Sequence, residues 1–107
     1  MGRYLILWQA NMGAPWPVDP AESWKLQEQM YALIDEQLKS GELDAFGFFL
    51  DGNSGYAFSS GEAADIYRRV SLFMPYILCT VDEVVPYEKG KALAQFIAKT
   101  QAELAQK

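Results

Sequence analysis

The stretch that decides the fold is residues 41–61, GELDAFGFFLDGNSGYAFSSG. It reads as a strand over Leu43–Leu50, a tight turn at Asp51-Gly52-Asn53 and a second strand over Ser54–Ser59. Asp, Gly and Asn tolerate the positive φ that hairpin turns require, and the aromatic residues on both sides favour strands. We therefore predict an antiparallel hairpin and arrange the rest of the chain around it.

A helix is predicted before the hairpin. Asp19 stands at a capping position, Pro20 fits the first helical position, and Glu22 follows three residues after the cap. Gly41 ends the helix after about Lys39. Its apolar residues recur at helical spacing and predict a face that lies on a sheet: Trp24, Met30, Tyr31, Ile34 and Leu38.

A strand over Arg3–Gln9 opens the chain, and both of its alternating faces are apolar, as in a central strand that is covered on both sides. After the hairpin, Ser59 followed by Glu62 resembles a capping box and predicts a helix that Pro75 ends. Residues 76–85 read as a fourth strand. A last helix, from about Glu88 to Gln106, has Leu93, Phe96, Ile97 and Leu104 on one side.

The element order is therefore β-α-β-β-α-β with an extra helix, in one domain over residues 1–107. Right-handed crossovers predict an α+β, ferredoxin-like fold with an antiparallel sheet of strand order 4-1-3-2 and both main helices on one face. The face opposite the helices must also be covered, because the sheet has more apolar side chains than one helix layer can cover. An open apolar patch of this kind predicts an interface or a ligand site. Its residues are the apolar half of the fourth strand with Tyr4, Ile6, Trp8, Phe46, Phe48, Tyr56 and Phe58.

The composition restricts the function. A net charge of -5 with scattered basic residues argues against nucleic-acid binding. The chain has no histidine, which removes the commonest general base and metal ligand, so we expect no metal and no cofactor. The first apolar run, residues 4–8, is too short for a signal peptide or a membrane span. We expect a soluble, cytoplasmic protein.

Several short segments resemble a known group of proteins: Ala14-Pro15-Trp16-Pro17, Asp19-Pro20, residues 48–52, Gly55-Tyr56 and Pro75-Tyr76. They are similar to small uncharacterised prokaryotic proteins grouped with muconolactone isomerase, within the dimeric α/β-barrel proteins. The resemblance implies a homodimer in which two open sheet faces pack together. The histidines that several members use have no counterpart here, so no catalytic residue is carried over.

The candidate ligand-binding residues are Tyr4, Trp8, Trp16, Tyr56 and Arg3. The aromatic residues either line a pocket between two sheets or pack in a dimer core. The loop that holds Trp16 between two prolines is either a lid or a preset loop packed on the core.

Asp82 and Glu83 are the candidate catalytic residues. Successive residues of a strand point to opposite faces, so one of the two carboxylates is expected to enter the cavity and the other to meet solvent. A carboxylate held near Trp8 and Tyr56 would have a raised pKa and would suit proton transfer. The alternative is a solvated strand end.

Each of the remaining polar segments and side chains has two possible interpretations. Asp51-Gly52-Asn53 is a ligand site or only a turn. Arg68 and Arg69 clamp an anion or form surface ion pairs. Cys79 is a nucleophile or a buried structural thiol.

Three hypotheses of function follow. The first is a homodimer with a cavity for a small apolar or aromatic ligand. The second is a cofactor-free isomerase or monooxygenase that resembles muconolactone isomerase. The third is a structural protein-interaction module.

Overall fold

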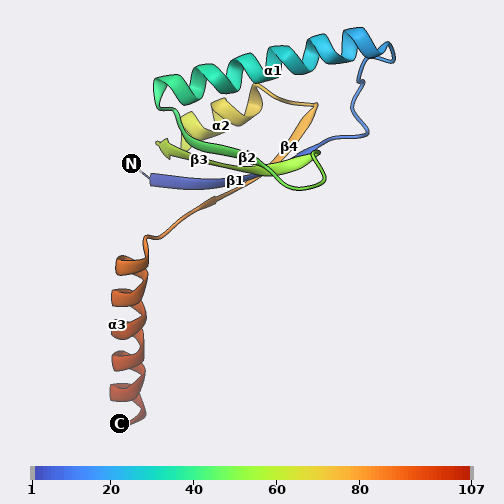
Figure 1. Cartoon of the computed structure of the whole chain (residues 1–107). Helices are drawn as coiled ribbons and strands as arrows, with labels where there is room; N and C mark the ends of the chain where they lie inside the picture. Colours follow the sequence, from blue (N-terminus) through green and yellow to red (C-terminus); the bar gives the residue numbers. More distant parts are fainter. Residues whose placement is uncertain (1, 107) are drawn as a thin grey trace.

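The computed structural model describes residues 2–106 as an α+β structure with one four-stranded antiparallel sheet. The strands are β1 (Gly2–Ala10), β2 (Leu43–Phe48), β3 (Ser54–Gly61) and β4 (Ile77–Glu83), and the helices are α1 (Pro20–Ser40), α2 (Ala63–Ser71) and α3 (Tyr87–Ala105). The neighbours run β2-β3-β1-β4, which from the other edge is β4-β1-β3-β2. Helices α1 and α2 lie on one face of the sheet (Figure 1).

The predicted hairpin is present, although β2 ends at Phe48 rather than at Leu50. In the turn, the Asp51 carboxylate accepts hydrogen bonds from the Asn53 N–H and the Ser54 hydroxyl, both at 2.9 Å. These bonds hold the pKa of Asp51 below its usual range. Gly52 has φ +74°, which favours glycine. The Asp51 carboxylate is therefore used by the turn itself.

Both predicted ends of α1 are confirmed. Asp19 Oδ2 accepts a hydrogen bond from the Glu22 N–H at 3.2 Å, and Gly41 takes the left-handed conformation with φ 84°. The predicted cap of α2 is wrong. Pairing with β1 extends β3 to Gly61, so Ser59 lies inside the strand and Glu62 is the N-cap residue.

The register of β1 corrects the predicted uncovered face. Ile6 lies opposite Ala57, whereas Leu7 lies opposite Tyr56, and directly opposed residues share a face. Ile6, Trp8 and Ala57 are buried, which places their face under the helices.

Five of the predicted aromatic and aliphatic residues therefore lie on the helix side, namely Tyr4, Ile6, Trp8, Phe46 and Phe48. Tyr56 and Phe58 lie on the uncovered face. The prediction failed because both faces of β1 are apolar, so hydrophobicity alone does not assign them.

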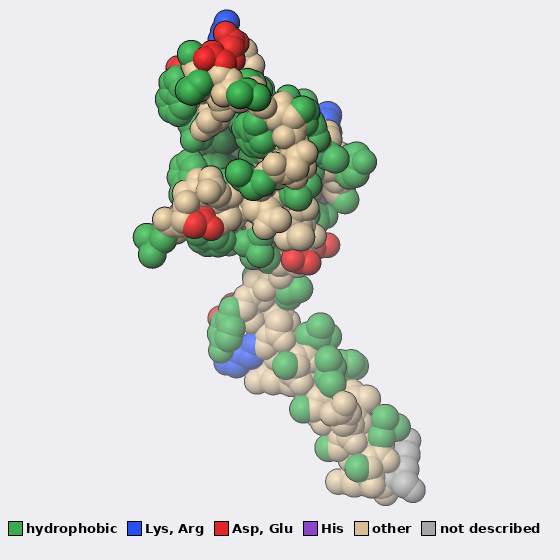
Figure 2. Space-filling view, turned by 90° about the vertical axis from the view of Figure 1, so that its right-hand side faces the viewer, with side chains coloured by type: hydrophobic (Ala, Val, Ile, Leu, Met, Phe, Trp, Pro, Cys, Tyr) green, Lys and Arg blue, Asp and Glu red, His purple; other side chains and the backbone are tan. Residues whose placement is uncertain are grey.

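The helix α3 projects away from the sheet (Figure 1). The radius of gyration is accordingly 19.0 Å, whereas a compact chain of this length has about 13 Å. The apolar side chains of α3 are exposed: Leu93, Phe96, Ile97 and Leu104. In the space-filling view, hydrophobic side chains spread over the body and continue along α3 (Figure 2).

Candidate functional site: a cavity between the first helix and the sheet

A cavity of about 550 Å³ lies on the helix side of the sheet. Helix α1 packs mainly against β2, and α2 against β3, so the space over the central strands is only partly filled. The strands contribute Ile6, Trp8, Leu43, Phe46, Ala57 and Cys79 to the lining. Its volume is in the range of small-molecule sites.

An aromatic cluster around Trp8 forms one wall. The Trp8 ring stacks on Phe46 with the centroids 5.3 Å apart, and Phe48 meets it edge-on at 5.4 Å. The indole N–H donates to the carbonyl oxygen of Gly47 at 3.2 Å. Gly55 leaves room for the ring, since a Cβ there would lie 2.6 Å from Trp8. The polar atom of Trp8 is thus paired, and its ring forms an apolar surface.

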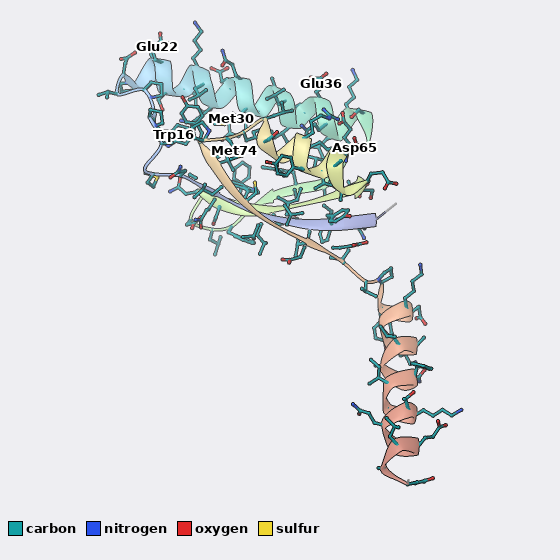
Figure 3. The ribbon with its side chains drawn as sticks, turned by 180° about the vertical axis from the view of Figure 1, so that it is seen from behind. Trp16, Glu22, Met30, Glu36, Asp65 and Met74 are labelled. Carbon is teal, nitrogen blue, oxygen red and sulfur yellow. The ribbon has the colours of Figure 1, made fainter. Side chains whose placement is uncertain are left out.

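The loop after β1 contributes Met12, Ala14 and Trp16 to the lining. The backbone N–H of Asn11 donates to the carbonyl of Tyr76, and the Trp16 indole donates to the Asn11 carbonyl at 2.7 Å. The Trp16 ring also packs on Tyr76, with the centroids 4.9 Å apart. In this structure, therefore, hydrogen bonds fix the loop and the Trp16 indole packs against Tyr76. Figure 3 shows Trp16 beside the start of α1, with Met30 on the side of α1 that faces the sheet.

The inward stripe of α1 is less apolar than predicted. It consists of residues at helical spacing that line the cavity, namely Ser23, Gln27, Met30, Ile34 and Gln37. Trp24 and Leu38, predicted to face the sheet, are 52% and 39% exposed. The stripe is therefore rotated about the helix axis relative to the prediction. The helical spacing of Ser23, Gln27 and Gln37 could have placed them on the inward face of α1. Because they are polar, they were not assigned to that face.

The two glutamines of this stripe differ. The Gln27 amide donates to the Ser23 hydroxyl at 3.4 Å. Gln37 is only 6% exposed, and its side chain forms no hydrogen bond with any residue between 2 and 106. The Gln37 amide is therefore available to a polar group that enters the cavity.

Arg69 lies at the same end of the cavity and is the one charged side chain among the described lining residues. Its Nη1 donates to the carbonyls of Glu42 and Ser60 and to the Ser59 hydroxyl. Its Nε lies 3.2 Å from Glu42 Oε2, although the N–H is not directed along a hydrogen bond. Arg69 therefore pairs with a carboxylate that Arg68 also approaches. Sequence reasoning did not place Arg69 at a cavity.

Of the predicted ligand-binding residues, the structure brings Trp8 and Trp16 to the cavity. Tyr4 packs against the core on the helix side. Tyr56 and Arg3 belong to the uncovered face, where the Arg3 guanidinium lies 4.5 Å from the centroid of the Phe58 ring. Arg68 is exposed and lies 3.6 Å from Glu42 Oε2, as in a surface ion pair.

Asp82 and Glu83 are exposed at the end of β4, opposite Leu5 and Tyr4. Neither lines the cavity. The expectation of a carboxylate between Trp8 and Tyr56 is wrong, because these two residues lie on opposite faces of the sheet.

Cys79 lines the cavity, and burial raises the pKa of its thiol to about 11. A neutral thiol at physiological pH is a weak nucleophile. Among residues 2–106, no group of acidic or thiol side chains is arranged to hold a metal ion.

A second hollow, of about 530 Å³, lies on the uncovered face, where Leu7, Phe49, Leu78 and Thr80 line it. Here the sheet has no covering helix (Figure 1). The helix-side cavity is bounded by strands, two helices and a loop, and is the better-formed site.

No protein-family model matches the chain, and no curated protein is similar to it. The relationship to the dimeric α/β-barrel proteins therefore stays a prediction. None of the helices within residues 2–106 has the length and apolar character needed to cross a membrane.

Proposed function

We propose that this protein binds a small apolar or aromatic molecule in the cavity between α1 and the sheet. The observation that carries the proposal is the cavity of about 550 Å³ with its wall of Trp8, Phe46 and Phe48. Aromatic walls with few polar groups are typical of sites for small molecules. The ligand lies within one chain, between helices and sheet, rather than between two sheets.

Binding is favoured over catalysis by the chemistry of the lining. The lining residues described within 2–106 include no carboxylate, and burial keeps the Cys79 thiol neutral at physiological pH. An isomerase or monooxygenase reaction would therefore have to use a hydroxyl group of the lining, such as that of Tyr31, for proton transfer.

The protein is further proposed to act as a homodimer with a ferredoxin-like fold, in which the uncovered sheet faces meet. Its accessible surface is 7779 Å², whereas a monomer of 12.0 kDa exposes roughly 6,000 Å². The excess per chain is about twice the roughly 800 Å² that each partner buries in a standard interface, so it is large enough for one. Leu7 and Leu78 on the uncovered face are 40% and 43% exposed.

The charge of α3 supports its contact with a second copy. Residues 87–107 contain four lysines and two glutamates, a net charge of +2. Residues 1–86 contain twelve acidic and five basic residues, a net charge of -7. A basic arm with an apolar stripe is complementary to the acidic body of another chain.

The ligand proposal is tested by equilibrium dialysis against naphthalene, a rigid apolar probe. Wild type is expected to bind it, and Ala10→Leu is expected to weaken binding at least 5-fold, because Ala10 lines the cavity. The matched control is Ala32→Leu, which adds the same atoms at an exposed position of α1. Equal affinity of the two variants, or no binding by wild type, would reject the proposal.

A further inference from the structure

We infer that the ligand of this cavity is an un-ionised aromatic alcohol or phenol, whose hydroxyl group binds the side-chain amide of Gln37. This inference rests on the proposed function and specifies its ligand class. It is carried by the combination of a polar side chain that is only 6% exposed, its position in the lining, and its lack of a hydrogen-bond partner within residues 2–106.

Gln37 is the one buried amide side chain among the described lining residues, and we assign one polar group of the ligand to it. Gln27 already donates to Ser23, and the Trp8 and Trp16 indoles donate to backbone carbonyls. A primary amide offers both a donor and an acceptor. A ligand hydroxyl group can donate to the amide oxygen or accept from the amide NH₂ group. The rest of the ligand then contacts apolar and aromatic side chains.

The ion pairs at the same end disfavour an anion. Arg69 is the one charged group among the described lining residues, and Glu42 Oε2 lies 3.2 Å from its Nε. A ligand carboxylate would therefore lose its water and compete with Glu42 for the Arg69 guanidinium, which is costly. A neutral hydroxyl has a much smaller desolvation cost and would satisfy the Gln37 amide.

Three ligands with the same bicyclic ring test this inference: naphthalene, 2-naphthol and 2-naphthoate. By equilibrium dialysis at pH 7, wild type is expected to bind 2-naphthol about 10-fold more tightly than naphthalene, the effect of one additional hydrogen bond to a buried amide. It is expected to bind 2-naphthoate more weakly than either.

Gln37→Leu is expected to remove the preference for 2-naphthol and to keep the affinity for naphthalene. Gln29→Leu is the matched control, since it makes the same change at an exposed position of α1 outside the lining. It is expected to keep the preference. Gln37→Met serves as a second variant if thermal unfolding shows that the leucine variant is not folded.

The outcomes separate the two proposals. Binding of naphthalene and 2-naphthol with equal affinity would overturn the inference and leave the apolar site in place. A preference that survives Gln37→Leu, or tightest binding of 2-naphthoate, would also overturn it, the latter pointing to Arg69. No binding of either naphthalene or 2-naphthol would reject the proposed function itself.

Discussion

The Arg69 side chain in α2 contacts both the backbone carbonyl and the side-chain carboxylate of Glu42. Its Nη1 donates to the Glu42 carbonyl at 3.2 Å, and its Nε lies 3.2 Å from the Glu42 carboxylate. The same Nη1 also serves Ser59 and Ser60 in β3. One guanidinium thus ties α2 to the end of the hairpin and closes one end of the cavity.

Arg69→Leu is expected to lower the free energy of unfolding by about 2–3 kcal/mol, because it leaves partly buried carbonyl and hydroxyl groups without their donor. Urea denaturation measures the change. Arg68→Leu is the control, because the Arg68 side chain is 60% exposed and its ion pair with Glu42 is long. That variant is expected to change stability very little. Equal losses in the two variants would contradict the role given to Arg69.

Gln37→Leu is expected to raise the free energy of unfolding by at most about 1 kcal/mol in the absence of ligand, because it replaces a largely shielded amide, which has no hydrogen-bond partner within residues 2–106, with an apolar side chain. Gln27→Leu is expected to give no such gain, since that amide donates to Ser23. Thermal unfolding of both variants and of wild type measures these changes in stability. A Gln37→Leu variant less stable than wild type would show that the amide has a partner in solution.

Cys79 gives stability a dependence on alkaline pH. Burial raises the pKa of its thiol from 9.0 to about 11. Between these values the unfolded chain loses a proton that the native protein keeps, so the free energy of unfolding falls as pH rises. Wild type is expected to lose more stability than Cys79→Ala between pH 9 and 11 in urea denaturation. Parallel curves would contradict a buried thiol.

Self-association is expected to depend on α3. Light scattering over a dilution series should give about twice the 12.0 kDa mass of the chain. Replacing Phe96 and Ile97 with glutamine should shift the protein toward monomer, because both are exposed apolar residues of α3. The control is Gln95→Ala, a change at an exposed polar position of α3. A monomeric wild type at high concentration would contradict the homodimer.

The sequence predicted the features that are encoded locally. The cap at Asp19, the left-handed Gly41 and the hairpin turn at Gly52 each follow from a few neighbouring residues, and each is present. The apolar side of α3 was also visible, since Leu93 and Phe96 stand at helical spacing. Its projection away from the body was not, because helical periodicity says nothing of what a helix packs against.

The site depended on features that local patterns do not encode. Trp8 and Tyr56 were placed in one pocket, but strand register puts them on opposite faces. Gln37 has a polar side chain that sequence reasoning assigns to solvent, and only the packing of α1 buries it. Ser59 looked like a helix cap, and pairing with β1 made it part of a strand.

The most direct test of the helix-side cavity is an NMR measurement of contacts between naphthalene protons and the methyl groups of the protein. The account predicts intermolecular nuclear Overhauser effects to Ile6, Met30 and Ile34, which line the cavity. Effects confined to Leu7 and Leu78 would place the ligand on the uncovered face and contradict the account.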